Sequence, residues 1–191
     1  SGAIAMGVGK LNLSTRPSDA PTKQAAAAVG QCELMYIYDR LFAEHNHTVA
    51  QLLITAPDID DPVRKENFHN TLERLLAFRV LPIINENDTV STEELGIGDN
   101  DTLSATVAAS VNADLLVLLS DIDGLYDQDP HINPHARLIP VVEKLDEHIL
   151  SLAGGKGSAL GTGGMVTKLR AAQIAGAAGV DMVIANGQDP L

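Results

Sequence analysis

The sequence predicts an α/β fold in which helices cover both faces of a mostly parallel sheet, an αβα sandwich. Three observations support this prediction. Apolar runs such as LLVLL at 115–119 lack alternation of polar and apolar residues, which is typical of strands buried on both faces. Amphipathic segments with helical spacing separate the runs. Polar residues follow several runs directly, at the end of the strand where parallel sheets bind ligands.

The first amphipathic segment predicts a long helix over 19–47. Apolar residues recur at mostly helical spacing there, and Thr22 follows Pro21 as a candidate N-cap. Cys32 lies in the middle of this helix among apolar residues, so we expect it in the core.

Two strands and a second helix follow. The segment 48–55 has the length and β-branched ends of a short buried strand. Asp61 and Pro62 then occupy the cap and first-turn positions of a helix over 60–78. The next strand is expected over 80–85.

The second half continues the same pattern. We expect a helix from 99–101 through 112, a strand over 114–120, a short strand and helix within 139–155, a helix over 165–178 and a strand over 181–186. No long linker or internal repeat interrupts the pattern, so residues 1–191 are expected to form one domain.

Composition restricts the partners of the protein. The 191 residues contain 13 Lys and Arg against 25 Asp and Glu, a formal charge of −12, which argues against nucleic acid or an anionic membrane as the main partner. The longest apolar runs are far shorter than the roughly 20 residues that a membrane helix needs, so no membrane span is expected. The single cysteine fits the reducing cytoplasm, where we place the protein.

Three polar clusters lie where ligands bind in such sheets. They are NEND at 85–88, SDIDG at 120–124, and GDND at 98–101 before a helix. Each cluster alone is also what ordinary turns and helix caps contain. Their joint placement at strand ends favours a binding site.

A glycine-rich segment precedes the helix expected at 165–178. Gly161, Gly163 and Gly164 surround Thr162, and Lys168 follows one turn into the helix. Glycines allow backbone N–H groups to approach an anion, and a helix N-terminus favours negative charge, so this segment is a candidate phosphate site. The lysine does not follow the glycine directly, which disfavours a P-loop.

The sequence gives little support for a metal site or for a catalytic triad. The pairs His45/His47 and His131/His135 lack a Cys or acidic partner in a ligand pattern, so no resident metal site is expected. No G-x-S-x-G elbow is present, which makes hydrolysis by a nucleophile triad improbable.

Five motifs together resemble the glutamate 5-kinases, a group within the amino acid kinase family. They are SGAIAMG, VLPIINENDTV, GDNDTLSA, SDIDGLYDQDP and LGTGGMVTK, and they span essentially the whole chain. The resemblance implies an ATP-dependent, Mg²⁺-requiring transfer of phosphate to the side-chain carboxylate of L-glutamate, giving L-glutamyl 5-phosphate in proline synthesis. It also implies a homo-oligomer, a dimer or a tetramer.

The resemblance assigns roles residue by residue. It implies that Asp101 and Lys168 are catalytic, with Asp101 organising the lysines. The implied glutamate-binding residues are Ser1, Gly2, Ala3, Asn85, Asp88 and Asn100. The implied nucleotide-binding residues are Ser120, Asp121, Thr162, Gly163, Gly164, Met165, Val166, Thr167 and Lys168.

The chain also departs from the family pattern. The family's opening lysine-bearing strand and its last strands have no counterpart, so we expect the kinase domain to be incomplete at both ends. Two alternatives therefore stay open. One is another amino acid or carbamate kinase of the family, and the other is a non-catalytic module that binds an amino acid or a nucleotide.

Overall fold

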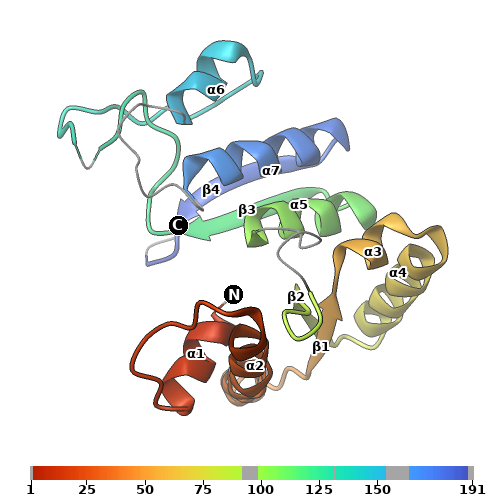
Figure 1. Cartoon of the computed structure of the whole chain (residues 1–191). Coiled ribbons are helices and arrows are strands. Elements are labelled where there is room, and N and C mark those ends of the chain that lie inside the picture. The colour runs from red at the N-terminus through yellow and green to blue at the C-terminus, as the bar shows by residue number, and fades with distance from the viewer. Residues whose placement is uncertain (1, 92–98, 131, 154–163, 189–191) are drawn as a thin grey trace. The chain divides into compact units, whose positions relative to one another are not determined.

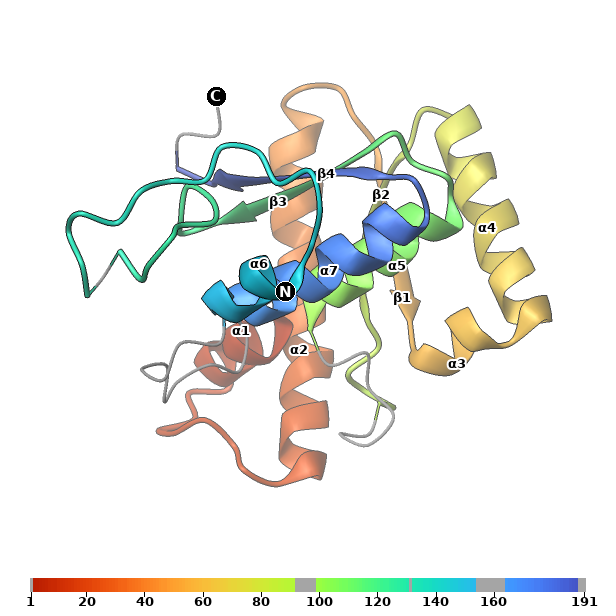
Figure 2. The same ribbon diagram turned by 90° about the horizontal axis from the view of Figure 1, so that it is seen from above.

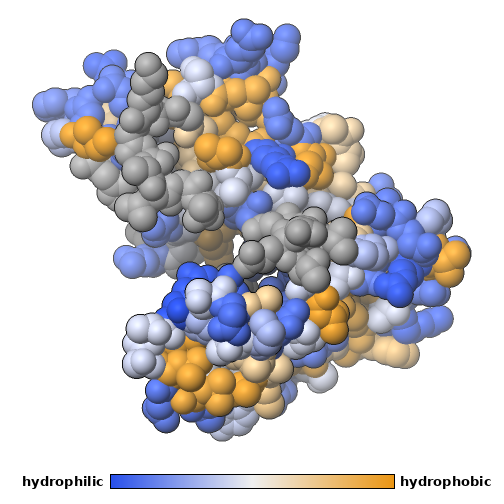
Figure 3. Space-filling view, viewed as in Figure 1, coloured by the Kyte–Doolittle hydropathy of each residue, from blue (hydrophilic) through white to orange (hydrophobic). Residues whose placement is uncertain are grey.

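The computed structural model describes residues 2–91, 99–130, 132–153 and 164–188, and these form two compact units, Ser1–Asn100 and Asp101–Leu191. The single domain expected from the sequence stays a prediction. No helix in the described part of the chain combines the length and hydrophobicity that crossing a bilayer requires. On the face seen in Figure 3, hydrophobic residues form small groups among hydrophilic ones.

The first unit contains two parallel strands and the helices connected to them (Figure 1). The strands pair from Val49 opposite Leu81 to Ile54 opposite Glu86. Helix α2 contacts β1, and α4 contacts β2. The elements are α1 (Ala3–Lys10), α2 (Ala20–Ala43), β1 (Val49–Ile54), α3 (Ala56–Asp60), α4 (Pro62–Ala77) and β2 (Leu81–Glu86).

The second unit repeats the parallel arrangement with a second pair of strands. They pair from Leu115 opposite Asp181 to Ser120 opposite Asn186. The elements are α5 (Asn100–Ser110), β3 (Leu115–Ser120), α6 (Glu147–Ala153), α7 (Met165–Ala177) and β4 (Asp181–Asn186). The α/β class with parallel strands is confirmed. The short strand expected within 139–155 is not found, because the described residues of that segment, 139–153, contain helix α6 and no strand.

Alanines bring two helices close to the strands of the second unit. Ala105 and Ala108 of α5, with Ala171 and Ala175 of α7, pack against buried residues of β3 in a core cluster. Figures 1 and 2 show α5 and α7 along the same face of the β3–β4 pair. Side chains on the other face are exposed, namely Leu115, Val117, Leu119 and Val183. The packing therefore brings the two helices together on one face, where the candidate catalytic residues lie.

Helix α1 packs against α2 through glycines, which corrects the buried face expected for the long helix. A Cβ on Gly7 would lie 1.8 Å from the carbonyl oxygen of Ala26, and a Cβ on Gly30 would lie 1.7 Å from that of Ala3. Three of the four buried residues of α2 are therefore Ala or Gly, the fourth is Gln31, and Cys32 is exposed rather than in the core. Helix α1 itself was not predicted from the sequence.

Side-chain caps fix where the long helices begin. Asp19 is the N-cap of α2, because its carboxylate accepts a hydrogen bond from the backbone N–H of Thr22 at 2.9 Å. The prediction that Thr22 is the cap is wrong by three residues. Asp61 caps α4 and accepts from Arg64 N–H, with Pro62 at the first helical position, as predicted.

Candidate active site

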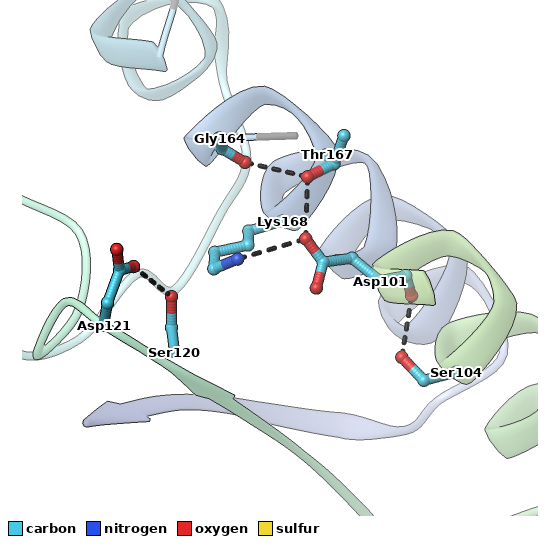
Figure 4. A network of polar contacts seen from close by, with 7 residues as sticks. All are labelled: Asp101, Ser104, Ser120, Asp121, Gly164, Thr167 and Lys168. Atoms are coloured by element: carbon cyan, nitrogen blue, oxygen red, sulfur yellow. Dashed lines mark hydrogen bonds and ion pairs between the residues drawn. The ribbon is translucent and has the colours of Figure 1, made fainter. Parts of the chain in front are cut away.

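A buried lysine in the first turn of α7 contacts the first turn of α5. Lys168 is 8% exposed, and its Nζ lies 3.1 Å from Oδ2 of Asp101 (Figure 4). The same carboxylate oxygen accepts a hydrogen bond from Oγ1 of Thr167 at 2.7 Å. Asp101 therefore connects two consecutive side chains of α7 to the start of α5.

This arrangement can hold an anionic group. A buried ammonium is costly unless it is paired, and Asp101 supplies the partner. Lysine has three donor hydrogens, so a hydrogen bond to Asp101 leaves donors for the oxygens of a ligand. The backbone N–H groups at the start of α7 add partial positive charge beside Lys168.

The hydroxyl of Thr167 has two acceptors within reach. It lies 2.7 Å from the Asp101 carboxylate and 2.8 Å from the backbone carbonyl of Gly164. A hydroxyl carries one proton, so it donates to one of these acceptors at a time. Thr167 therefore connects the residue that precedes α7 to the Asp101 carboxylate.

The predicted nucleotide residues Ser120 and Asp121 lie at the carboxyl end of β3, and Ser120 Oγ donates to Asp121 Oδ1 at 3.2 Å (Figure 4).

Asp123 was given no separate role by the sequence analysis. Its carboxylate accepts from Asn186 Nδ2 at 2.8 Å and from the hydroxyl of Tyr126 at 3.1 Å. The hydrogen bond from the Tyr126 hydroxyl to Asp123 raises the pKa of Tyr126. Asp123 thus connects the segment after β3 to the end of β4. The position of Asp123 in the SDIDG cluster is the sequence feature from which a role could have been predicted.

In the first unit, the predicted residues Asn85 and Asp88 lie at and just after the end of β2. Asn85 is 4% exposed, and its Nδ2 donates to Oε1 of Gln31 on α2 at 3.0 Å. The next segment is ordered by short contacts, since Ser91 Oγ donates to Glu86 Oε1 at 2.7 Å and Asn87 N–H donates to the carbonyl of Ile54 at 2.8 Å.

Burial raises the pKa of Asp88 above its usual value, and the nearby charge of Glu86 raises it further. The folded protein therefore holds this proton more tightly than the unfolded chain. Ionised Asp88 costs stability, and the cost grows as the pH rises from the unfolded value of 3.8 through the raised folded value.

We accordingly expect Asp88→Asn to raise the melting temperature relative to the parent protein at pH 7, and to make little difference below about pH 3.5. Thermal unfolding at several pH values measures this effect. Asp39→Asn, at an exposed position of α2, is the control. A stability gain for Asp88→Asn that is equal at all pH values would contradict the explanation.

The remaining predicted residues divide as follows. Gly2 precedes α1 with a φ of 100°, which favours glycine, and Ala3 is buried. Asn100 is the first residue of α5, while Met165 and Val166 begin α7. Ser1, Thr162 and Gly163 lie outside the described residues.

The structure thus brings together Asp101, Gly164, Thr167 and Lys168 in one cluster, and Ser120 and Asp121 in a second contact of the same unit. In the described part of the chain, no group of three or more His, Cys, Asp or Glu side chains could hold a metal ion.

Known proteins resemble this chain in sequence and in fold. The profile described as the amino acid kinase family matches residues 1–186. A glutamate 5-kinase from Clostridium tetani is 57% identical over 187 residues, covering 98% of this chain and 70% of that protein. A glutamate 5-kinase from Symbiobacterium thermophilum is 54% identical over 190 residues, covering 100% of this chain and 72% of that protein.

Among solved structures, a carbamate kinase from Giardia lamblia bound to AMP-PNP shares the fold with a TM-score of 0.58. The sequences are 19% identical, and the match covers 99% of this chain and 74% of that one. Because the family profile spans nearly the whole chain and relatives exceed 50% identity, the chain belongs to the amino acid kinase family.

Proposed function

We propose that this chain catalyses transfer of the γ-phosphoryl group of ATP to the side-chain carboxylate of L-glutamate, giving L-glutamyl 5-phosphate, the first step of proline biosynthesis. The observation that carries the proposal is Lys168, held buried against Asp101 at the start of α7. The identity of 57% to a glutamate 5-kinase supports the choice of substrate. A cytoplasmic location and a homo-oligomeric state, a dimer or a tetramer, belong to the same proposal.

The reaction needs alignment and charge neutralisation more than acid–base chemistry. A carboxylate oxygen of glutamate forms a bond to the γ-phosphorus, the bond from that phosphorus to the β–γ bridging oxygen breaks, and ADP leaves. An ionised carboxylate is already a nucleophile, so no general base is required. Lys168 stabilises the charge on the transferring group, and Asp101 holds the Lys168 ammonium in place.

The other residues bind the two substrates. We assign Ser120, Asp121 and residues 162–168 to ATP, and Gly2, Ala3, Asn85, Asp88 and Asn100, with Ser1, to glutamate. Mg²⁺ enters as part of the ATP complex, since Mg²⁺ at phosphates keeps several waters and needs few protein ligands. The carboxylate of Asp88 suits the glutamate ammonium, and asparagine amides can bind either end of the amino acid.

The experiment is ADP release measured with purified protein and L-glutamate, L-aspartate or carbamate as acceptor. We expect turnover to depend on L-glutamate and to be at least about a hundredfold slower with the other two, because positioning fixes which carboxylate meets the phosphoryl group. Preferred turnover of aspartate or carbamate would move the chain to another kinase of the family. Binding of glutamate and ATP without turnover would indicate a non-catalytic module.

Replacement of Asp88 or Asn100 with Ala tests the glutamate site. A lost hydrogen bond to a charged group should raise the KM for glutamate by about tenfold or more, with little change in the KM for ATP. Asp39→Ala, on the exposed side of α2, is the matched control and should change neither constant. Equal increases in both constants would assign Asp88 and Asn100 a structural role instead.

A further inference from the structure

Three side-chain amides from three elements of the first unit form a hydrogen-bonded row. Asn85 of β2 donates through Nδ2 to Oε1 of Gln31 on α2 at 3.0 Å. Gln31 in turn donates through Nε2 to Oε1 of Gln51 on β1 at 3.1 Å. The middle residue of the row is therefore bonded at both ends of its amide.

Packing alone does not require an amide at position 31. Gln31 is 6% exposed, on a helix face whose other buried residues are Ala26, Ala27 and Gly30. Glutamine is seldom buried, and burying its amide is costly unless both ends are satisfied. A methionine of similar length would fill the position without that requirement. The role of the Gln31 amide is therefore to be sought in its hydrogen bonds to Asn85 and Gln51.

In this row one end of the Asn85 amide is paired and the other end is open. An asparagine amide has an acceptor end and a donor end, and a half-turn of the amide exchanges them. Because Nδ2 donates to Gln31, Oδ1 is the end that remains for another partner, and no donor to it lies among the described residues. Gln51 of β1 accepts from the donor end of Gln31, which leaves the acceptor end of Gln31 facing Asn85.

We propose that Gln31 is a positioning residue that orients the Asn85 amide so that Asn85 offers a carbonyl oxygen, and hence accepts a hydrogen bond from the ammonium of the amino acid substrate. The inference rests on the proposed function, in which Asn85 binds glutamate. Gln31 itself touches no substrate. Asp88, three residues after Asn85, supplies a second acceptor suited to the same ammonium.

The test compares two ligands that differ in the ammonium group, L-glutamate and glutarate. Their affinities are measured by calorimetry for the parent protein and for Gln31→Met. We expect Gln31→Met to weaken L-glutamate binding by about tenfold and glutarate binding by less than about twofold, since only the ammonium contact is lost. Equal weakening of both ligands, or no change in either, would overturn the proposal.

A second arm uses Asn85→Asp, whose carboxylate has an acceptor oxygen at either end and needs no orienting partner. In that background, adding Gln31→Met should change the ratio of the two affinities by less than about twofold. A tenfold change in this background would show that Gln31 acts by another route, and would contradict the orienting role.

Two further variants complete the design. Gln24→Met removes a half-buried amide two turns earlier on α2, where it donates to the Ser91 carbonyl at 3.3 Å, and should leave the affinity ratio unchanged. Gln51→Leu changes an exposed residue, and should lower the ratio of L-glutamate affinity to glutarate affinity by less than the tenfold expected for Gln31→Met. This variant keeps the test available if Gln31→Met does not fold. An unchanged ratio in Gln51→Leu would then count against the proposal.

The readout separates this inference from the proposed function. A protein that binds L-glutamate but transfers no phosphate would contradict the proposed function, while the affinity ratios would still test Gln31. A protein that turns over L-glutamate with unchanged ratios in Gln31→Met would contradict the positioning role alone. A protein that binds neither ligand would overturn both.

Discussion

Replacing Lys168 with Ala is expected to lower kcat by about a hundredfold or more, because the variant lacks the cation that we propose stabilises the transferring phosphoryl group. A hundredfold loss corresponds to about 2.7 kcal/mol of transition-state stabilisation. The ammonium is buried and held 3.1 Å from Asp101, so solvent cannot substitute for it without rearrangement. Steady-state kinetics with ATP and L-glutamate measure the effect.

Arg170 provides the matched control for Lys168. It lies two residues further along α7 and is exposed, so Arg170→Ala removes one positive charge from the same helix without disturbing the cluster at Asp101. We expect kcat for this variant to stay within about twofold of the parent value. A kcat for Lys168→Ala that matches the parent value would remove Lys168 from the catalytic assignment.

Replacing Gly30 with Ala is expected to lower the free energy of unfolding by about 3 kcal/mol or more. The new Cβ would lie 1.7 Å from the carbonyl oxygen of Ala3 and 2.5 Å from the backbone nitrogen of Gly7, so α1 and α2 would have to separate. Overpacking typically costs about 1–3 kcal/mol, and backbone atoms yield less readily than flexible side chains. Chemical denaturation measures the loss.

Gly9 gives this prediction an internal control on α1. A Cβ at Gly9 would meet no atom within 4 Å, so Gly9→Ala should be neutral or should stabilise the helix by up to about 1 kcal/mol. The two substitutions are chemically identical and differ only in their surroundings. If both variants lost the same stability, helix contact at Gly30 would not be the cause.

The α1–α2 contact should also affect the proposed glutamate site. Ala3 begins α1 and is buried against α2, directly after Gly2 with its positive φ. We therefore expect a Gly30→Ala protein that still folds to bind glutamate less tightly than the Gly9→Ala protein. The same calorimetric titration with L-glutamate would show it.

Local features of the sequence determined most of the elements. The strands expected over 114–120 and 181–186 match β3 and β4 to within a residue, because an apolar run bounded by polar residues identifies a short buried strand without reference to the rest of the chain. The cap at Asp61 and the start of α7 at Met165 were likewise predictable, since capping and glycine breaks act within a single turn.

The sequence also identified the catalytic candidates, since Lys168 stands one turn beyond a glycine-rich segment and Asp101 opens a helix. It could not show that the two side chains meet. They lie 67 residues apart, and their contact depends on α5 and α7 packing on one face of β3–β4 through alanines. That approach is a property of surfaces that meet only in the folded chain.

Tertiary structure alone decided which face of α2 is buried. Helical spacing placed Cys32 in the core, yet the helix buries Ala26, Ala27, Gly30 and Gln31. Its neighbour α1 approaches so closely at Ala26 and Gly30 that larger side chains do not fit at Gly30. Folding also brought Gln31 of α2 to Asn85 of β2, 54 residues away. Periodicity reports that a helix has an apolar face, whereas the close approach of two backbones determines which residues can fill it.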